Sequence, residues 1–169
     1  MASRRLLLVE DSSTMRRMLS TMLREEGFEV ETANDGLQGL AKARIDPRPE
    51  LILSDYEMPE LDGAGLCQAL KADKELRSIP VMMLTTLGEA QNKIAGLTAG
   101  ADAYIEKPKG TDDFRVLCAQ IQAHLRIADL GIELANRSIE LANRNRLLES
   151  AQKKLFFELE LARDRKSVV

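Results

Sequence analysis

Five short apolar runs alternate with segments of helical periodicity, and this alternation limits the fold more than any other feature. The apolar runs are RLLLVE, FEVETA, LILS, IPVMML and ADAYIE, at residues 5–10, 28–33, 51–54, 79–84 and 101–106. Helical spacing marks residues 12–27, 34–46, 63–73 and 88–100, and a last helix is predicted to begin near Thr111 and Asp112. Apolar strands joined by helices indicate a parallel sheet covered on both faces. The sequence therefore predicts an α/β, doubly wound (βα)5 fold with a five-stranded parallel sheet, followed by a long C-terminal α-helix.

Composition and charge limit the partners that we expect. The chain has 169 residues, of which 44% are hydrophobic and 30% charged. No apolar run approaches the roughly 20 residues that span a bilayer, so no membrane partner is expected. Residues 1–125 carry 15 basic and 20 acidic residues, a net charge of −5, and residues 126–169 carry 9 and 7, a net charge of +2. Neither part is basic enough to predict nucleic-acid binding, and we expect a cytoplasmic protein without a nucleic-acid partner.

Polar residues stand at the ends of four of the predicted strands. Glu10 and Asp11 end the first strand, Asp55 the third, Thr85 the fourth and Lys107 the fifth. Because the carboxyl ends of parallel strands share one edge, these side chains are expected to lie close together. Each residue alone has an ordinary explanation as a helix cap or a solvated side chain. Their coincidence at four strand ends favours a functional site.

The chemistry of this group is specific. Three neighbouring carboxylates repel one another, and one of them would keep its proton unless a cation neutralised the site. Only oxygen ligands are present, which favours a hard cation, and Mg²⁺ above all. A carboxylate beside Mg²⁺ can attack a phosphoryl group and form an acyl phosphate. The metal, an ammonium and a hydroxyl would then bind the three phosphoryl oxygens.

The segments that carry these residues resemble the receiver domain of two-component response regulators, whose single-domain form is the chemotaxis response regulator. The resemblance covers residue 4 to about residue 125 and rests on LLLVEDS, SDYEMPELDG, PVMMLTT and AGADAYIEKP. It implies the flavodoxin-like receiver fold and a histidine kinase or phosphotransfer protein as the phosphoryl donor. It also implies that Asp55 is the phosphoacceptor. Asp11 and Asp55 would bind Mg²⁺ directly, Glu10 largely through water, and Glu57 through its backbone carbonyl.

The same resemblance assigns roles to the polar residues of the fourth and fifth strands. Thr85 and Lys107 would hold the phosphoryl oxygens of the modified protein. Tyr104 would be the switch residue that turns inward when Thr85 is drawn to the phosphate. The Lys107–Pro108 peptide bond would be cis, which is a conformation that only bonds preceding proline reach at low cost.

Some positions depart from the family pattern or tune it. Lys109, followed by Gly110, stands where the family often has an aromatic or apolar residue, and Thr86 stands where alanine is common. These residues border the pocket and the face that the family uses for signalling. Glu57 and Leu87 occupy positions that tune dephosphorylation in the family, so the sequence does not give the lifetime of the phosphorylated state.

The C-terminal segment, residues 126–169, contains a seven-residue repeat. IELANRS at 132–138 is followed at once by IELANRN at 139–145. A seven-residue repeat over five heptads indicates a coiled coil, and Asn145 and Gln152, which face the apolar row, favour a parallel homodimer. A helix folded back on its own domain, or a bundle with a neighbour, remains an alternative. The row that recurs every seven residues consists of Ile127, Leu134, Leu141, Leu148, Leu155 and Ala162.

Together these observations predict a non-enzymatic signalling module. A receiver at residues 1–125 would accept a phosphoryl group and transmit the change through a dimerising helix at residues 126–169. A diguanylate cyclase, a serine phosphatase or a histidine kinase could be the output, and the sequence does not choose among them. One rival is a Mg²⁺-dependent phosphohydrolase with Asp55 as nucleophile and Glu57 as acid/base. Another is a scaffold pseudo-receiver that is never phosphorylated.

Overall fold

The computed structural model describes residues 3–86 and 99–166. The chain divides into two compact units, Met1–Ala128 and Asp129–Val169. No helix of the described ranges is long and apolar enough to cross a membrane. The elements in chain order are β1 (Arg5–Val9), α1 (Ser13–Glu25), β2 (Glu29–Ala33), α2 (Gly36–Ala43), β3 (Leu51–Asp55), α3 (Gly63–Ala72), β4 (Val81–Thr85), β5 (Ala103–Glu106) and α5 (Thr111–Lys166).

The first unit is built on one parallel sheet. Its strand order is β2-β1-β3-β4-β5, and each neighbouring pair is parallel. The chain moves outward from β1 to β2 and then crosses back to β3, β4 and β5. Such a reversal leaves a crevice at the carboxyl ends of β1 and β3. The predicted five-stranded, doubly wound fold is confirmed.

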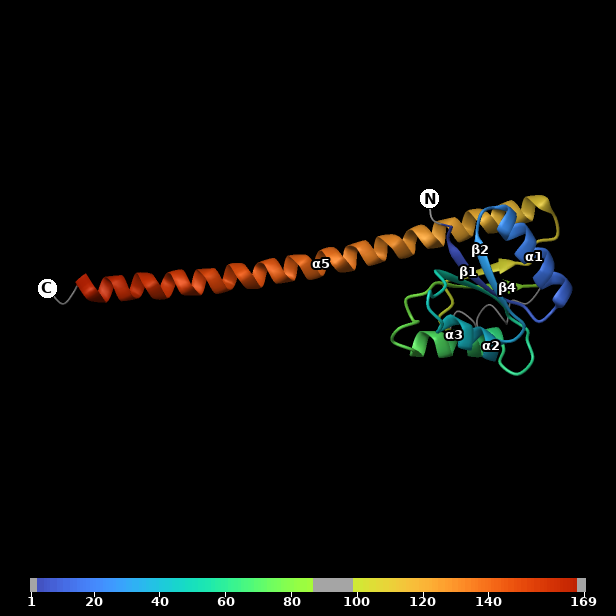
Figure 1. Cartoon of the computed structure of the whole chain (residues 1–169), viewed down its shortest axis with the longest axis horizontal. Coiled ribbons are helices and arrows are strands. Elements are labelled where there is room, and N and C mark those ends of the chain that lie inside the picture. The colour runs from blue at the N-terminus through green and yellow to red at the C-terminus, as the bar shows by residue number, and fades with distance from the viewer. Residues whose placement is uncertain (1–2, 87–98, 167–169) are drawn as a thin grey trace. The chain divides into compact units, whose positions relative to one another are not determined.

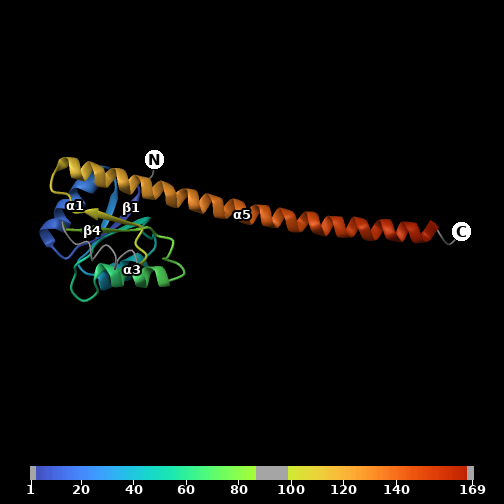
Figure 2. The same cartoon turned by 180° about the vertical axis from the view of Figure 1, so that it is seen from behind.

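Helices cover both faces of this sheet. Helix α1 and the first turns of α5 lie on one face, and α2 and α3 lie on the other (Figures 1 and 2). Successive strand residues point to opposite faces, so Leu6 and Leu8 pack against α1 and α5, whereas Leu7 and Val9 pack toward α2 and α3. These side chains are almost completely buried, and burial of each contributes about 1.5–3 kcal/mol before entropy is considered.

Several element boundaries differ from the prediction. Asp55 and Thr85 are the last residues of β3 and β4, so the sheet itself holds both side chains. The helix predicted over residues 34–46 is shorter: it begins at Gly36, because Asp35 caps it by accepting a hydrogen bond from the Gln38 amide at 2.7 Å, and it ends at Ala43. The helix predicted over residues 88–100 falls mostly outside the described residues.

The second unit contains the rest of α5. Its large apolar side chains are exposed. Four that recur every seven residues, called here the leucine row, have exposed fractions between 55% and 66%: Leu134, Leu141, Leu148 and Leu155. This unit carries the predicted seven-residue repeat in helical form throughout the described range. The coiled coil itself stays a prediction. The exposed apolar residues of this unit include Leu130, Ile132, Leu134, Ile139, Leu141, Leu147, Leu148, Leu155, Phe156, Phe157, Leu159 and Leu161.

Candidate functional site

The carboxyl edge of the sheet brings the predicted polar residues together. Asp55 and Thr85 end neighbouring strands, and Glu10 directly follows β1. The backbone amide of Glu10 donates to the Ala33 carbonyl at 3.1 Å, and that of Lys107 donates to the Thr85 carbonyl at 2.8 Å. Sheet-like bonding therefore continues beyond the strand ends and fixes where the Glu10 and Lys107 side chains start.

The ammonium group of Lys107 lies between two buried carboxylates. Its Nζ atom is 2.7 Å from Asp55 Oδ2 and 3.0 Å from Glu10 Oε2. Glu10 is completely buried and Asp55 is 5% exposed. Burial of an unpaired carboxylate is costly, so Lys107 stabilises both acids at once.

The protonation behaviour of the site reflects this crowding. Burial, with the added repulsion of Asp55, raises the pKa of Glu10 to about 7, although bonds from Lys107 and the Ser12 amide oppose the change. Burial acts to lower the pKa of Lys107. Its hydrogen bonds to Asp55 and Glu10 outweigh that effect and raise the pKa overall. A single ammonium thus leaves the site with excess negative charge.

Three carboxylates of this edge can bind a metal ion together. Glu10, Asp11 and Asp55 each offer an oxygen, and these oxygens lie within 4.8 Å of one another. Asp11 is exposed and, with Glu57 and Met58, lines a cleft of about 430 Å³. An all-oxygen set with one member, Asp11, on a solvent-accessible cleft fits Mg²⁺, which keeps several of its waters when it binds.

Two buried hydroxyl groups complete the neighbourhood. Among the described residues, neither Thr85 Oγ1 nor Tyr104 Oη has a hydrogen-bond partner. Tyr104 pairs in register with Met83, and Thr85 lies two residues further along β4, so both side chains are on one face of the sheet. A buried donor without a partner costs free energy, and both hydroxyls would gain from a new acceptor.

One expected backbone feature differs. The cis peptide bond of the described residues is Asp46–Pro47, and the Lys107–Pro108 bond is not cis. The expectation of a cis bond after Lys107 is therefore wrong for this structure. The two forms of an X–Pro bond differ by only about 0.5–1 kcal/mol, so the family pattern alone could not decide between them.

Sequence reasoning missed Arg16, a residue of α1 that contacts the acid loop. Its Nη1 atom donates to the backbone carbonyls of Glu10 and Asp11, at 2.6 and 3.2 Å. These two bonds hold the backbone of the short connection that carries both acids. A spacing of six residues from Glu10 matches no motif, so nothing in the sequence pointed to this contact.

The pair Arg16 and Arg17 allows a matched test. Arg16→Met should weaken Mg²⁺ binding by roughly three- to tenfold, because loss of two hydrogen bonds to carbonyls loosens the Glu10–Asp11 backbone. Arg17→Met removes the same charge from an exposed position and should leave the affinity nearly unchanged. Calorimetric titration with Mg²⁺ measures both constants. Equal affinities for the two variants would show that Arg16 does not position the acids.

Sequence reasoning also missed the steric constraint on Gly63. A Cβ atom at this position would collide with the Asp55 carbonyl oxygen and lie 2.9 Å from Tyr56 Cα. The Gly63 amide donates to the Tyr56 carbonyl at 2.9 Å. The start of α3 therefore packs directly against the backbone that carries Asp55, and only glycine permits this approach. The sequence showed the Asp62–Gly63 pair but not the neighbouring backbone.

Comparison with known proteins identifies the family of the chain that carries this site. A family model described as the response regulator receiver domain matches residues 6–122. The chain belongs to this family. The receiver is also similar to the chemotaxis response regulator CheY4 of Vibrio cholerae, with 33% identity and a TM-score of 0.65, over 73% of this chain and 99% of that structure. The receiver domain of a histidine kinase from Syntrophus aciditrophicus gives 37% identity and a TM-score of 0.66, over 73% and 91%.

Several curated relatives of the receiver are transcriptional regulators. The DNA-binding dual master transcriptional regulator RpaA of Synechocystis is 38% identical over 125 residues, or 74% of this chain and 50% of that protein. A CpxR homolog of Haemophilus influenzae is 43% identical over 72% of this chain and 50% of that protein. The chain thus spans about half the length of these relatives. The receiver is a two-component signal-transduction domain, as the sequence predicted.

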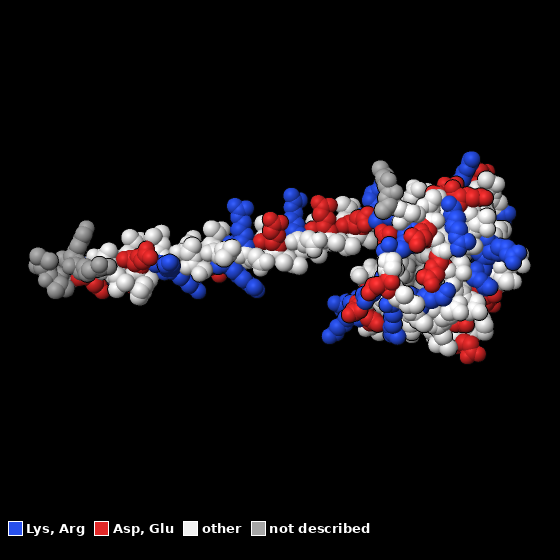
Figure 3. Space-filling model, in the orientation of Figure 1, with Lys and Arg blue, Asp and Glu red and all other residues white. Residues whose placement is uncertain are grey.

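The expectation that no nucleic acid is involved is wrong. RpaA and the MtrA relative from Mycolicibacterium paratuberculosis are both named as DNA-binding regulators. The expectation rested on the charge of this chain alone. Basic and acidic side chains are indeed mixed on the receiver face shown in Figure 3. That charge carries no information about the half of each relative that lies outside the match, so it could not exclude DNA.

Proposed function

We propose that Asp55 accepts a phosphoryl group from a histidine kinase or a phosphotransfer protein in a Mg²⁺-dependent reaction. The observation that carries this proposal is the position of Asp55, whose Oδ2 lies 2.7 Å from Lys107 Nζ, beside two more carboxylates. An ammonium at this distance can follow the charge as it moves from carboxylate to phosphate. Membership of the receiver family supports the same assignment.

The proposed step is a displacement at phosphorus. A carboxylate oxygen of Asp55 forms the new P–O bond, the P–N bond to the donor histidine breaks, and the imidazole leaves with the bonding electrons. A magnesium ion, when bound by Glu10, Asp11, Asp55 and the Glu57 carbonyl, supplies the positive charge that offsets the incoming phosphoryl group. One phosphoryl oxygen would face the metal. Lys107 and Thr85 would bind the other two, as ammonium and hydroxyl donors.

A phosphohydrolase is the rival function, because Glu57 lines the same cleft as Asp11. Incubation with excess labelled acetyl phosphate and Mg²⁺ separates the two. A receiver should take up label to a plateau of one phosphoryl group per chain, with slow release of phosphate. Rapid multiple turnover without a stable plateau would support the phosphohydrolase. Absence of any label would support the scaffold pseudo-receiver.

The signal within the receiver is proposed to pass through Thr85 and Tyr104. When Asp55 is phosphorylated, the buried Thr85 hydroxyl gains an acceptor and moves toward it, and Tyr104 on the same face fills the space. Phosphorylation thus shifts a two-state equilibrium by contacts that exist in only one state. We expect the ring signals of Tyr104 to change by NMR when BeF₃⁻ and Mg²⁺ are added. Unchanged Tyr104 signals alongside a shifted Asp55 region would contradict the switch.

The proposed route out of the receiver is α5. Its residues beyond 128 expose a leucine row that two copies of the chain could bury in a two-stranded coiled coil. The proposed module is thus a cytoplasmic homodimer that carries a phosphorylation signal and performs no catalysis of its own.

We propose DNA as a class of partner, because two relatives are named as DNA-binding regulators. The test is the fluorescence anisotropy of a labelled duplex titrated with this chain and BeF₃⁻. A rise that weakens steeply with salt would place DNA contacts within these 169 residues. No rise in anisotropy would show that these residues do not bind DNA.

A further inference from the structure

The second unit has a helix seam whose two sides differ in chemistry. One side is the leucine row, Leu134, Leu141, Leu148 and Leu155, with exposed fractions of 66%, 55%, 55% and 58%. The other side is formed by the residues that lie four positions after each leucine of this row, and it is called here the polar row. The polar row consists of Ser138, Asn145 and Gln152, and the apolar Leu159 stands at the next such step. In heptad terms the leucines occupy d positions and the polar row occupies a positions.

The polar row distinguishes between the ways in which two copies can align. In a parallel pair in register, each a residue faces the same residue of its partner, so Asn145 and Gln152 each meet an identical amide and can hydrogen-bond to it. In an antiparallel pair with matched ends, Asn145 would face the partner's Leu148 and Gln152 would face the partner's Leu141. Their buried amides would then lose their hydrogen bonds, which is costly. The polar row therefore favours the parallel pair.

Charges beside the seam favour the same arrangement independently. Arg144 and Glu158 stand just before a positions, and Glu149 and Arg163 stand just after d positions. The positions just before a are g positions, and those just after d are e positions. In a parallel coil each g residue contacts the e residue that lies five residues further along the partner. Arg144 therefore meets the partner's Glu149, and Glu158 meets the partner's Arg163. Both contacts occur twice by symmetry, and all of them are attractive.

The antiparallel pair uses these charges less well. In that alignment positions of the same kind face each other, which leaves Arg144 opposite Ala151 and leaves Glu149 opposite Ala142. Only Arg137 and Glu158 would pair. Within one chain, no ion pair joins Arg144, Glu149, Glu158 or Arg163 across the described residues, so these charges are available to a partner. Figure 3 shows uncharged side chains between the charged ones along this unit.

We propose that the second unit binds a second copy of this chain in parallel and in register. The pairing is set by amide contacts at Asn145 and Gln152 and by ion pairs from Arg144 to the partner's Glu149 and from Glu158 to the partner's Arg163. This inference rests on the dimerising helix of the proposed function. To the parallel orientation predicted from the sequence it adds the register and the ion pairs that set it, which determine how a signal from one receiver reaches its copy.

Cysteine cross-linking tests the register. Asn145→Cys should form an interchain disulfide rapidly under mild oxidation, because a positions of a parallel coil face each other. Asn143→Cys is the matched control, since this asparagine lies on the outer side of the helix and should not cross-link. The native Cys67 and Cys118 are buried and should stay reduced. A dimer by sedimentation that fails to cross-link at residue 145 would overturn the register but leave the dimer intact.

Charge reversal tests the ion pairs. Glu149→Arg should raise the dimer dissociation constant by roughly tenfold, since two attractive contacts become repulsive. Adding Arg144→Glu restores opposite signs and should return the constant to near its original value. A double variant as weak as the single one would overturn the assigned pairs. A native chain that is monomeric by sedimentation would overturn the dimer itself, and with it this part of the proposed function.

Discussion

Lys107→Met should lower the free energy of unfolding of the magnesium-free protein by about 3 kcal/mol at pH 8. The reason is that Lys107 is the cation between Asp55 and Glu10, at 2.7 and 3.0 Å, and its loss leaves two buried carboxylates that repel each other. The loss should shrink as the pH falls from 8 to 6, because Glu10 has a pKa of about 7 with Lys107 present and a higher pKa without it, so it takes up a proton and loses its charge over this range. Urea unfolding at pH 8 and pH 6 measures both effects.

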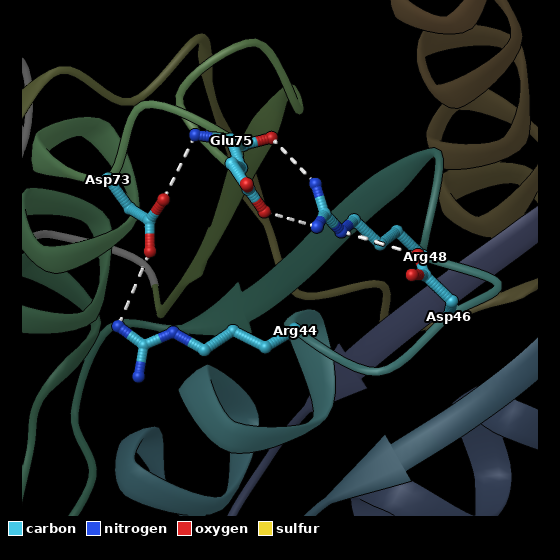
Figure 4. Close-up of polar contacts among 5 residues, drawn as sticks. All are labelled: Arg44, Asp46, Arg48, Asp73 and Glu75. Carbon is cyan, nitrogen blue, oxygen red and sulfur yellow. Dashed lines mark hydrogen bonds and ion pairs between the residues drawn. The ribbon is translucent and has the colours of Figure 1, made fainter.

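A surface ion pair provides the control. Arg44 Nη2 lies 3.4 Å from Asp73 Oδ2 in the group of polar contacts of Figure 4, and the Arg44 side chain is 58% exposed. Arg44→Met should cost less than about 1 kcal/mol, since solvent screens that pair. Addition of Mg²⁺ should stabilise the Lys107 variant more than the control, because the metal replaces the missing charge. Equal costs for the two variants would show that Lys107 does not neutralise the acid pair.

Leu141→Lys together with Leu148→Lys should convert the proposed unphosphorylated dimer to a monomer. Each leucine would bury a side chain worth about 1.5–3 kcal/mol in the coil, and each lysine would bring a charge into the seam. The receiver should be unaffected, since both residues belong to the second unit. Sedimentation equilibrium at tens of micromolar measures the association, and acetyl phosphate labelling checks the receiver.

Two other leucines serve as the matched control. Leu147 and Leu161 are exposed in the same helix but stand outside the seam, at c positions. Leu147→Lys with Leu161→Lys introduces the same number of charges and should leave the dimer intact. Dissociation by both double variants would point to a general charge effect. A monomeric native chain would favour the folded-back helix.

Much of the site could be predicted because the fold fixes where strands end. The alternation of strands and helices places Glu10, Asp55, Thr85 and Lys107 at one edge before any side chain is positioned. The pairing of Lys107 with both acids could not be predicted, because it depends on rotamers and burial that the sequence pattern does not encode.

Other features depend on contacts between segments that no local pattern records. Arg16 reaches back to the carbonyls of Glu10 and Asp11 across a turn of helix, and Gly63 is required by a backbone that lies eight residues earlier at Asp55. Helix α3 was closer to its prediction than α2, and in both the residue just before the helix, Asp62 or Asp35, caps it with its own side chain. The prediction that no nucleic acid is a partner was the weakest, because it rested on the charge of these residues alone.

The most direct test of the central claim is the intact mass of the protein after incubation with acetyl phosphate and Mg²⁺. The native chain should gain the mass of one phosphoryl group, and removal of Mg²⁺ by a chelator should prevent the gain. Asp55→Asn should show no gain, because an amide cannot form the acyl phosphate, and Asp11→Ala should show none because the metal site is lost. A native chain that stays unmodified, or an Asp55→Asn variant that still gains the phosphoryl mass, would contradict the assignment of Asp55 as the phosphoacceptor.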